Sequence, residues 1–582
     1  MSARLKRLGE KLLRMVAYVR ARPRRMTLVV LGLYIVLVAA VTFPFVLHPA
    51  STTIAPLGGD IDSSIAKYEA LKGGGNLDPF VTTRFPWIAY PDGSPNNMGV
   101  DRVSALSTVL LWLGSDTLGP LSAHSWLSFS GLVATAFVMF LFVRRVTKSS
   151  LAGFLAGFMY GFWPEMYSLI GSNQTYVHMW LYILPIWAFW ELAAHGYSDR
   201  RVGLAIASIV PGVFWTPYYT FHLFLVGGVC LVVALAYLWK RAGWRQAVGV
   251  GAVTAIVWEV VFVVYRLIGF STSATLIPTR TMAEIYNQSA SPWMYVLPGK
   301  FSWGMTDDPL LVHLVPRTGW TNLYLGLSVL ALAAVGVVVV WRARRRVGEA
   351  LEWRAAAVLG LVVAAACFAF SLPPTFRLGH WKLPTPNYVI AHVEPALRAG
   401  QRLVMPLMAG VVVLAALGAW SLLRRLRGRA RWAAAGVMLV VLGADLWALP
   451  PDDTTRILTY PSMVALAREP KAPVAFFENG SLLPSYPQVP CLLQHEFNKP
   501  LINDCGLGRS ALLGAIVDNG TPLCEQIAKI RAVGTRYLVT APHDAGVEAC
   551  LSEAQATERI VAQDATYRVI MLKPKKEEAN GS

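Results

Sequence analysis

Charged residues are scarce in this chain of 582 residues, of which only 15% are Asp, Glu, Lys or Arg. A soluble protein has roughly 25% charged residues, so this chain has too little charge to cover a water-facing surface. Hydrophobic residues make up 55% of it and recur in runs near the ~20 residues that a helix needs to cross a bilayer. The sequence therefore predicts a polytopic α-helical membrane protein, since barrel strands would alternate apolar and polar residues.

Several sequence motifs of well-known enzyme classes are also absent. The chain has no Walker A loop, no Gly-x-Ser-x-Gly elbow, no His-Glu-x-x-His pair and no Cys-x-x-Cys pair. ATP hydrolysis, serine hydrolase chemistry and a structural zinc site therefore have no support. The near two-fold repeat and the matched broken helices that are common in secondary transporters are missing as well.

Basic residues are unevenly distributed along the chain. The formal net charge is +18, yet the residues from 451 onward contain 13 Lys and Arg against 15 Asp and Glu. The surplus therefore lies in the apolar part, in short clusters between the apolar runs, as the positive-inside rule describes for cytoplasmic loops. This distribution argues against nucleic acid as a partner.

The clusters and the apolar runs together predict the topology. We expect a basic amphipathic helix at 1–25 on the cytoplasmic leaflet and a membrane part at 26–449 with about eleven transmembrane helices. The N-terminus is then cytoplasmic and the C-terminus external, with long external loops at 49–122, 269–321 and 371–401, the first of which includes an interfacial or re-entrant helix at 103–121. The expected spans are near 26–47, 125–146, 151–169, 177–196, 203–217, 219–239, 247–267, 322–342, 353–371, 402–421 and 432–449.

The C-terminal part has the pattern of a separate unit. Residues 450–572 alternate strand-like stretches, at 472–477, 533–541, 560–562 and 567–572, with helix-like stretches at 523–532 and 545–554, which is typical of a small α/β domain. A charged tail at 573–582 is expected to be disordered. Four cysteines fall in this unit, namely Cys491, Cys505, Cys524 and Cys550. Because charge counting places the unit outside, we expect two disulfides formed in an oxidising compartment. Pairing of neighbours, Cys491 with Cys505 and Cys524 with Cys550, is one of three possibilities.

Two carboxylates, Asp60 and Asp62, follow a pair of glycines in the first predicted external loop. Asp60 is our candidate general base, which would take a proton from an acceptor hydroxyl. The two together could instead bind a divalent cation, Mg²⁺ or Mn²⁺, beside a phosphate, and no cofactor is certain. Asp62 has a structural alternative as the N-cap residue of a helix at 63–71, because Asp is favoured at that position.

Basic residues on the predicted external side are candidates for binding a substrate phosphate. Arg280 and Lys300 belong to one long loop, whereas Arg398 and Arg402 lie four residues apart before a span and so share one helical face. Arginine suits phosphate because it donates two parallel hydrogen bonds, and the alternative is snorkelling to lipid headgroups. His178, at the start of a span, either contacts substrate or makes a structural hydrogen bond.

Glu259 lies in the middle of the predicted span at 247–267. An ionisable residue at that depth is costly, which makes it a functional candidate. The alternative is a neutral or arginine-paired carboxyl inside the helix bundle.

These features together resemble the GT-C superfamily of membrane glycosyltransferases, which use polyprenyl-phosphate-linked sugars. The likeness rests on the many spans and on an acidic motif in the first external loop, here Asp60-Ile61-Asp62. The chain looks closest to the bacterial branch that includes YfhO-like proteins. The similar stretches are 57–62, 90–93, 162–164, 291–298, 324–326 and 384–388, followed by Arg398 and Arg402-Leu403.

The resemblance implies a hexosyl- or pentosyltransferase of the cell envelope, in a bacterial inner membrane. It would move a sugar from a polyprenyl-phosphate donor to an extracytoplasmic glycan, lipid or protein, with Asp60 as the base and Arg398 or Arg402 as ligands of the lipid phosphate. The long acidic cluster of some metal-dependent members is absent, which leaves a metal requirement open. Two other classes also stay open: a non-catalytic scaffold or assembly factor for surface polysaccharide, and a lipid or glycan transporter.

Overall fold

The computed structural model describes most of the chain. The described residues are 23–50, 52, 54, 60–73, 75, 77–85, 87–95, 98–172, 175–270, 281–298, 323–342, 350–378, 381–393, 400–447, 460–477, 482, 489–503, 516 and 521–573. Most of the predicted amphipathic helix at 1–25 lies outside these ranges, as do Arg280, Lys300, Arg398 and Cys505. Asp60, Asp62 and Cys491 are described in their backbone only.

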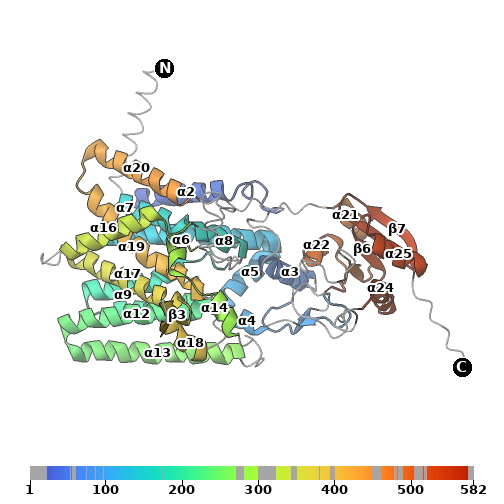
Figure 1. Ribbon diagram of the computed structural model, residues 1–582, viewed down its shortest axis with the longest axis horizontal. Coiled ribbons are helices and arrows are strands. Elements are labelled where there is room, and N and C mark those ends of the chain that lie inside the picture. The colour runs from blue at the N-terminus through green and yellow to red at the C-terminus, as the bar shows by residue number, and fades with distance from the viewer. Residues whose placement is uncertain are drawn as a thin grey trace, which may run out of the picture.

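Helices dominate the described residues and lie side by side in one bundle (Figure 1). The first half contains α2 (Pro23–Val41), α3 (Asp60–Gly73), α4 (Met98–Val103), α5 (Ala105–Leu118), α6 (Pro120–Thr147), α7 (Ser150–Gly161), α8 (Pro164–Ser172), α9 (Trp180–His195), α10 (Asp199–Ala207), α11 (Val210–Val213), α12 (Pro217–Ala242) and α13 (Trp244–Phe270). The second half contains α14 (Met282–Asn287), η1 (Pro292–Tyr295), α16 (Leu327–Arg342), α17 (Ala350–Ser371), α18 (Pro386–Val393), η3 (Gly400–Leu403), α19 (Val404–Leu423) and α20 (Gly428–Asp445).

Among the described residues, five helical segments are long and apolar enough to cross a membrane. They are α6, α12, α13, α17 and the continuous η3–α19 segment. The other six predicted spans overlap shorter or less apolar helices, namely α2, α7, α9, α10 with α11, α16 and α20, so the count of about eleven stays a prediction. The span expected at 203–217 is not one helix, because Pro211 lacks the backbone N–H that would continue α10 into α11.

α19 is the central helix of the bundle, with almost every residue buried. It packs closely against α16 and α17. A methyl group added to Gly418 would lie 2.0 Å from the carbonyl oxygen of Leu332, and one on Gly336 would lie 2.1 Å from that of Leu414. Glycine at both positions therefore allows the backbones of α16 and α19 to approach each other closely, as is usual between membrane helices.

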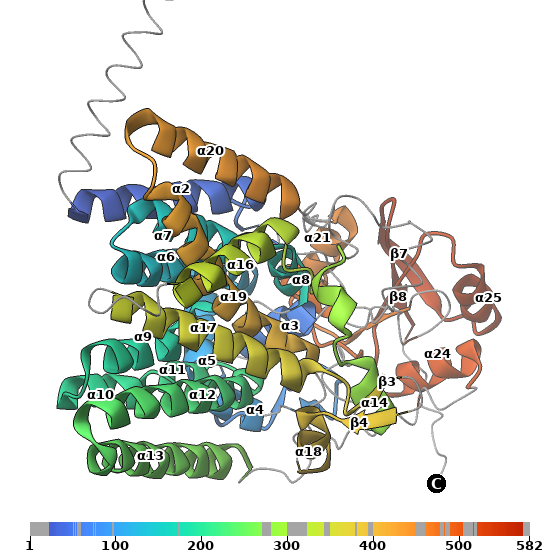
Figure 2. The same cartoon turned by 60° about the vertical axis from the view of Figure 1, so that its left-hand side comes forward.

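α13 lies at the edge of the bundle, as the two views in Figures 1 and 2 agree. Its main packing partner is α12, and only 22% of its most apolar window is buried. The side of α13 that faces away from α12 is therefore available to lipid or to another membrane protein.

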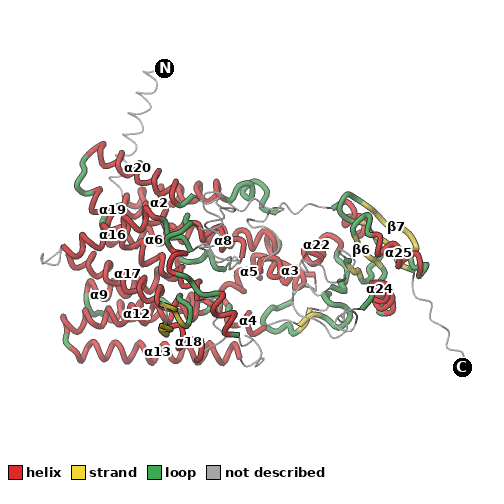
Figure 3. The backbone as a smooth tube through the Cα atoms, viewed as in Figure 1, coloured by secondary structure: helices red, strands yellow, loops and turns green. Residues whose placement is uncertain are grey.

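A four-stranded sheet lies beyond one end of the bundle (Figure 3). The strand order is β5 (Val474–Phe476), β6 (Tyr537–Thr540), β8 (Arg568–Leu572) and β7 (Thr557–Gln563), with β5 and β6 parallel and the other pairs antiparallel. Four further helices of the described residues belong to this part: α21 (Pro461–Arg468), α22 (Val489–Phe497), α24 (Leu523–Ala532) and α25 (Ala545–Glu553). β5, β6, β8, α24 and α25 lie within the stretches that the sequence pattern predicts, whereas β7 extends beyond the predicted strand at 560–562. The external location of this part stays a prediction.

The predicted disulfide between Cys524 and Cys550 is confirmed, and it joins α24 to α25. The two cysteines of the apolar spans, Cys230 and Cys367, are free and buried. Position 505 lies outside the described residues, so the predicted bond between Cys491 and Cys505 stays a prediction.

The loop between α3 and α4 connects the bundle to the C-terminal sheet. It includes the short antiparallel pair β1 (Arg84–Phe85) and β2 (Ser94–Pro95). Between those strands, the carbonyl oxygen of Trp87 accepts a hydrogen bond from the backbone of Leu501 at 2.8 Å, and the backbone N–H of Tyr90 donates to the carbonyl of Leu501 at 2.9 Å. Because α22 also packs on α3, the end of the bundle near α3 is held against the C-terminal part.

The predicted external loop at 371–401 is folded in its described part. It contains an antiparallel pair of strands, β3 (Thr375–Leu378) and β4 (Trp381–Pro384), followed by α18. Asn387 in α18 is buried and donates through its side-chain amide to the carbonyl of Leu372 at 2.9 Å. This bond fixes α18 to the end of α17.

Candidate active site

α3 is the helix that contains the acidic motif, and one of its sides is fixed to its neighbours. The hydroxyl of Ser64 lies 2.8 Å from Nε2 of His124 in α6. One turn further along, Lys67 forms an ion pair with the buried Asp101 of α4. Two more side chains of α3 donate to carbonyl oxygens of α5. α3 is therefore held along its length by three other helices.

The start of α3 corrects one prediction about the acidic motif. The helix begins at Asp60 rather than at 63, so Asp62 lies in the first turn and is not the N-cap residue. The N-terminus of a helix favours negative charge in its first turn, because the backbone N–H groups there point toward it. Asp60 precedes Ser64 by four residues, the spacing that places two residues on one side of a helix. The role of Asp60 as a base stays a proposal.

His124 has a fixed hydrogen-bonding state. It is completely buried, and its Nδ1 lies 2.7 Å from the carbonyl oxygen of Pro120, so Nδ1 is the nitrogen that donates. Nε2 is then the acceptor in the neutral ring, and the Ser64 hydroxyl is its donor. The sequence gives no signal for this pair, because the two residues are 60 positions apart and neither belongs to a known motif.

The loop between α8 and α9 is held mainly by side chains of other segments. Successive carbonyl oxygens accept hydrogen bonds from buried residues: Thr175 from Trp215 Nε1 at 3.0 Å, Tyr176 from Tyr219 Oη at 2.6 Å, and Val177 from Thr135 Oγ1 at 2.9 Å. Non-helical backbone inside a membrane protein needs such partners, since lipid offers none. The conformation of this loop is thereby tied to α6 and α12.

His178 follows in the same loop and is buried. Its Nδ1 accepts a hydrogen bond from Trp180 Nε1 at 3.0 Å, and its Nε2 lies 3.0 Å from the carbonyl oxygen of Leu127. Both ring nitrogens therefore have protein partners. This arrangement favours the structural alternative for His178 over contact with a substrate phosphate.

Arg402 lies in η3, at the start of the segment that continues into α19. Its Nη1 donates to the hydroxyl of Tyr176 at 2.9 Å, and its guanidinium carbon lies 4.6 Å from the centre of the same ring. The side chain is partly buried. A guanidinium group has five N–H donors in a planar arrangement that matches phosphate oxygens. Of the four basic residues predicted to bind phosphate, Arg402 is the one that the described residues include.

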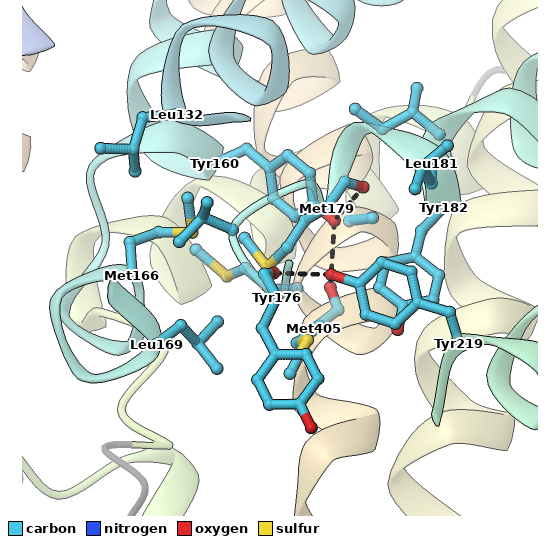
Figure 4. Packing of buried hydrophobic residues seen from close by; sticks show 14 of the residues in the cluster. Leu132, Tyr160, Met166, Leu169, Tyr176, Met179, Leu181, Tyr182, Tyr219 and Met405 are labelled. Atoms are coloured by element: carbon cyan, nitrogen blue, oxygen red, sulfur yellow. Dashed lines mark hydrogen bonds between the residues drawn. The ribbon is translucent and has the colours of Figure 1, made fainter. Parts of the chain in front are cut away.

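Tyr176, the partner of Arg402, belongs to a cluster of buried tyrosines. Figure 4 shows Tyr160, Tyr176, Tyr182 and Tyr219 gathered from different segments of the bundle. The rings of Tyr182 and Tyr219 lie 4.7 Å apart, and the hydroxyl of Tyr182 lies 2.8 Å from Nδ1 of the buried His222. Tyr219 and His222 are close in the sequence, but nothing in the sequence indicates that Tyr160 and Tyr176 belong to the same cluster.

α6 connects the two halves of the candidate site. His124 contacts α3 through Ser64, and three residues later the carbonyl of Leu127 contacts His178, two residues beyond Tyr176. Residues three apart lie on the same side of a helix. The start of α3 and the loop that contains Tyr176 are therefore both held by the first turns of α6. α3 lies at the end of the bundle that faces the C-terminal part (Figure 1).

A cavity of about 480 Å³ lies beside α3, between the bundle and α22. Its polar lining residues are Glu69, Lys72, Ser122, Gln494 and Asn498, and Trp87 adds an aromatic ring. Gln494 is buried and donates to the carbonyls of Trp87 and Lys499, both at 3.0 Å, while its side-chain oxygen has no hydrogen-bond partner among the described residues. Polar groups beside an aromatic ring suit a hydroxylated molecule such as a saccharide.

The described residues contain no group of three or more His, Cys, Asp or Glu side chains that could hold a metal ion. Mg²⁺ or Mn²⁺ at the acidic motif accordingly stays an expectation from the sequence alone.

Glu259 corrects another prediction. The sequence offered a carboxyl inside the bundle as one alternative, but α13 exposes this side chain on the outside of the bundle. The neighbouring Trp258 takes the inward position, where its ring meets Phe189 and Phe224. Both sides of α13 are apolar, so the hydropathy of the sequence could not tell which side faces the protein.

Comparisons with known proteins give weak likenesses only. No family model matches the sequence, and no curated protein matches it. Among solved structures, the chain is similar to the oligosaccharyltransferase AglB from Archaeoglobus fulgidus in complex with an inhibitory peptide and a dolichol-phosphate. The sequence identity is 12% and the TM-score is 0.42, and the match covers 88% of this chain and 69% of AglB. The chain is also similar to ArnT from Cupriavidus metallidurans bound to undecaprenyl phosphate, at 12% identity and a TM-score of 0.48, covering 93% and 97%.

Proposed function

We propose that this chain is a membrane glycosyltransferase that moves a sugar from a polyprenyl-phosphate donor to an acceptor on the outer face of a bacterial inner membrane. The observation that carries the proposal is the position of Arg402, which is partly buried and stacked on Tyr176, whose loop is held by the first turns of α6, as is the start of α3. A cation fixed among membrane helices suits a phosphate whose lipid tail stays in the bilayer.

In the proposed reaction, Arg402 binds the phosphate of the donor, and the acceptor enters at the start of α3, where the acidic motif lies in the sequence. Asp60 takes the proton from the acceptor hydroxyl while the acceptor oxygen forms a bond to the anomeric carbon of the sugar. The bond between that carbon and the phosphate oxygen breaks, with inversion at the carbon. The electron pair leaves with the polyprenyl phosphate, whose increased negative charge Arg402 stabilises.

The cavity beside α3 supports a place for the acceptor. Ile65, Glu69 and Lys72 line it from the same helix that begins at Asp60. These residues are spaced by three and four positions, so they present one side of α3 to the cavity. We therefore assign the acceptor, a cell-surface glycan, lipid or protein, to the space between the bundle and α22, and the donor lipid to the side near Arg402.

The test uses the full-length protein in nanodiscs with synthetic polyprenyl-phosphate sugars, one hexose or pentose at a time, and an extract of envelope glycans as acceptor. Release of free polyprenyl phosphate, measured by mass spectrometry, reports transfer. Asp60→Asn should abolish release while the variant still binds polyprenyl phosphate, because the variant lacks only the base. Full release by Asp60→Asn would overturn the assignment of the base, and no release by wild type with any donor would overturn the proposed function.

A further inference from the structure

Only one side of α13 is covered by the rest of the chain. Its buried residues, Ala247, Val250, Thr254, Trp258 and Tyr265, follow the three-to-four spacing of a single helical stripe. Exposed aliphatic side chains occupy the other directions. α13 thus packs against the bundle with one stripe and presents the rest of its circumference to its surroundings.

Glu259 lies on the uncovered part of this helix. It follows Trp258 by one residue, which turns it about 100° away from the buried stripe. Its side chain is exposed and makes no hydrogen bond or ion pair with any residue that the structure describes. The carboxyl group therefore faces outward from the bundle.

The depth of Glu259 makes this position costly. α13 spans Trp244–Phe270, so at 1.5 Å per residue Glu259 is about 22 Å from the first residue and about 16 Å from the last. A glutamate side chain is too short to reach either surface from there. Such residues in membrane spans normally face a partner or a water-filled cavity, because lipid satisfies neither the charge nor the hydrogen bonds.

The residues in line with Glu259 have the pattern of a helix-packing seam. Val248, Ala252, Ala255, Glu259 and Phe262 are spaced by four, three, four and three positions, and all of them are exposed. This repeat of 3.5 residues is that of two helices packed side by side. The two alanines allow a second helix to approach closely just before the carboxyl group.

We propose that this seam, defined by these five residues, binds a transmembrane helix of a second membrane protein, and that the helix has a Lys or Arg at mid-bilayer depth opposite Glu259. The negative charge of Glu259 indicates a partner with a basic residue at the same depth. A second copy of this chain would be oriented the same way in the membrane, so a symmetric contact between the two seams would bring Glu259 against Glu259. A basic residue instead forms an ion pair with the carboxylate, and lipid screens that pair very little.

The experiment uses the full-length protein in liposomes and three synthetic peptides of about 20 residues, enough to span the bilayer. One is all leucine, one has a single central Lys, and one has a single central Glu. Energy transfer between dyes on the protein and the peptide reports association. The Lys peptide should bind at least tenfold more tightly than the leucine peptide, and Glu259→Leu should remove that difference.

Two further variants separate the carboxyl group from the rest of the helix surface. Ala255→Trp keeps Glu259 but blocks the approach of a helix, so it should also weaken binding of the Lys peptide. Val260→Leu, next to Glu259 and outside the seam, should leave binding unchanged. These expectations are independent of the proposed transferase activity, because none of these residues belongs to the candidate active site.

Three results would overturn the proposal. The first is equal binding of the leucine and Lys peptides to the wild-type protein. The second is binding of the Lys peptide that survives Glu259→Leu. The third is self-association of the wild-type protein that Glu259→Leu abolishes while the Lys peptide fails to bind, which would identify a second copy of this chain as the partner.

Discussion

The guanidinium group of Arg402 donates to the hydroxyl of Tyr176 at 2.9 Å and lies over the same ring, although the two residues are 226 positions apart. Tyrosine is neutral at pH 7, so this contact orients the guanidinium without neutralising its charge. The carbonyl of Tyr176 is itself fixed by Tyr219. Tyr219 therefore fixes Tyr176, and Tyr176 fixes the guanidinium group of Arg402. A guanidinium group held in one position suits repeated binding of a phosphate.

Replacing Arg402 by Lys should weaken binding of undecaprenyl phosphate by at least tenfold. Lysine keeps the positive charge but has neither the planar set of donors nor the ring stacking of arginine. Native mass spectrometry of the protein with the lipid measures the change. Arg424 provides the matched control, because it stacks on Trp420 at 4.4 Å near the other end of the same helix. Equal losses in Arg402→Lys and Arg424→Lys would contradict a specific role for Arg402.

Tyr176→Phe should have a smaller effect on the same binding, roughly fivefold. The substitution removes the hydroxyl that Arg402 donates to but keeps the ring beneath it, so stacking is retained. The double variant with Arg402→Lys tests whether the two residues act together. If their effects on binding simply add, the contact between them does not orient the guanidinium for phosphate.

Tyr219→Phe should lower the stability of the bundle by about 1 to 3 kcal/mol, because the buried carbonyl of Tyr176 loses its donor. Thermal unfolding in detergent, followed by the fluorescence of a thiol dye at buried cysteines, measures the change. Tyr237→Phe in the same helix α12 is the control, since no hydrogen bond of its hydroxyl occurs within the described residues. An equal loss of stability in both variants would show that the hydrogen bond to the carbonyl of Tyr176 does not stabilise the bundle.

The sequence predicted those parts of the fold that depend on neighbouring residues. α24 begins and ends where its pattern indicates, and β5, β6 and β8 lie inside the predicted stretches. β7 includes the predicted stretch at 560–562 but is longer at both ends. The apolar runs likewise indicated the helices of the bundle, because a run of suitable length needs no knowledge of its neighbours. The predicted start of α3 was wrong, because the helix begins at Asp60, two residues before the predicted N-cap Asp62.

The candidate site was harder to predict because its contacts join distant residues. Nothing in the sequence near Ser64 or His124 indicates that they form a pair, and Tyr176 has no local pattern that points to Arg402. The exposure of Glu259 could not be predicted from the sequence either. Both sides of α13 are apolar, so periodicity cannot separate the buried side from the exposed one.

Acid should weaken the C-terminal part through Asp564. Partial burial acts to raise the pKa of this carboxyl, but hydrogen bonds from Ser462, Tyr567 and Thr566 outweigh it, and the pKa lies below its usual value. A pKa that is lower in the folded state stabilises the fold above the unfolded value, near pH 4, and this contribution is lost as the pH falls through the folded value. Unfolding of wild type and Asp564→Asn, compared between pH 5 and pH 3, should show a steeper loss for wild type. An equal loss of stability between pH 5 and pH 3 in the two proteins would exclude this role of Asp564.

Removing the disulfide between Cys524 and Cys550 should destabilise the same part of the chain. The bond closes a loop of 26 residues, which by loop entropy alone corresponds to about 3 to 4 kcal/mol. The double substitution to Ser should therefore expose the C-terminal part to protease at a lower temperature than in wild type, while the membrane bundle stays intact. Limited proteolysis during a temperature ramp, with the fragments identified by mass spectrometry, measures the unfolding of the C-terminal part and of the membrane bundle in one experiment.

The same disulfide also tests the predicted topology. Disulfides persist in oxidising compartments and are rare in the cytosol. In intact cells treated with a mild impermeant reductant, a membrane-impermeant maleimide should label Cys524 and Cys550 and should fail to label them without the reductant. Cys230 and Cys367, which are buried in the bundle, provide internal controls that should stay unlabelled in both cases. Labelling of Cys524 and Cys550 only after the cells are opened would place the C-terminal part in the cytoplasm and overturn the predicted orientation.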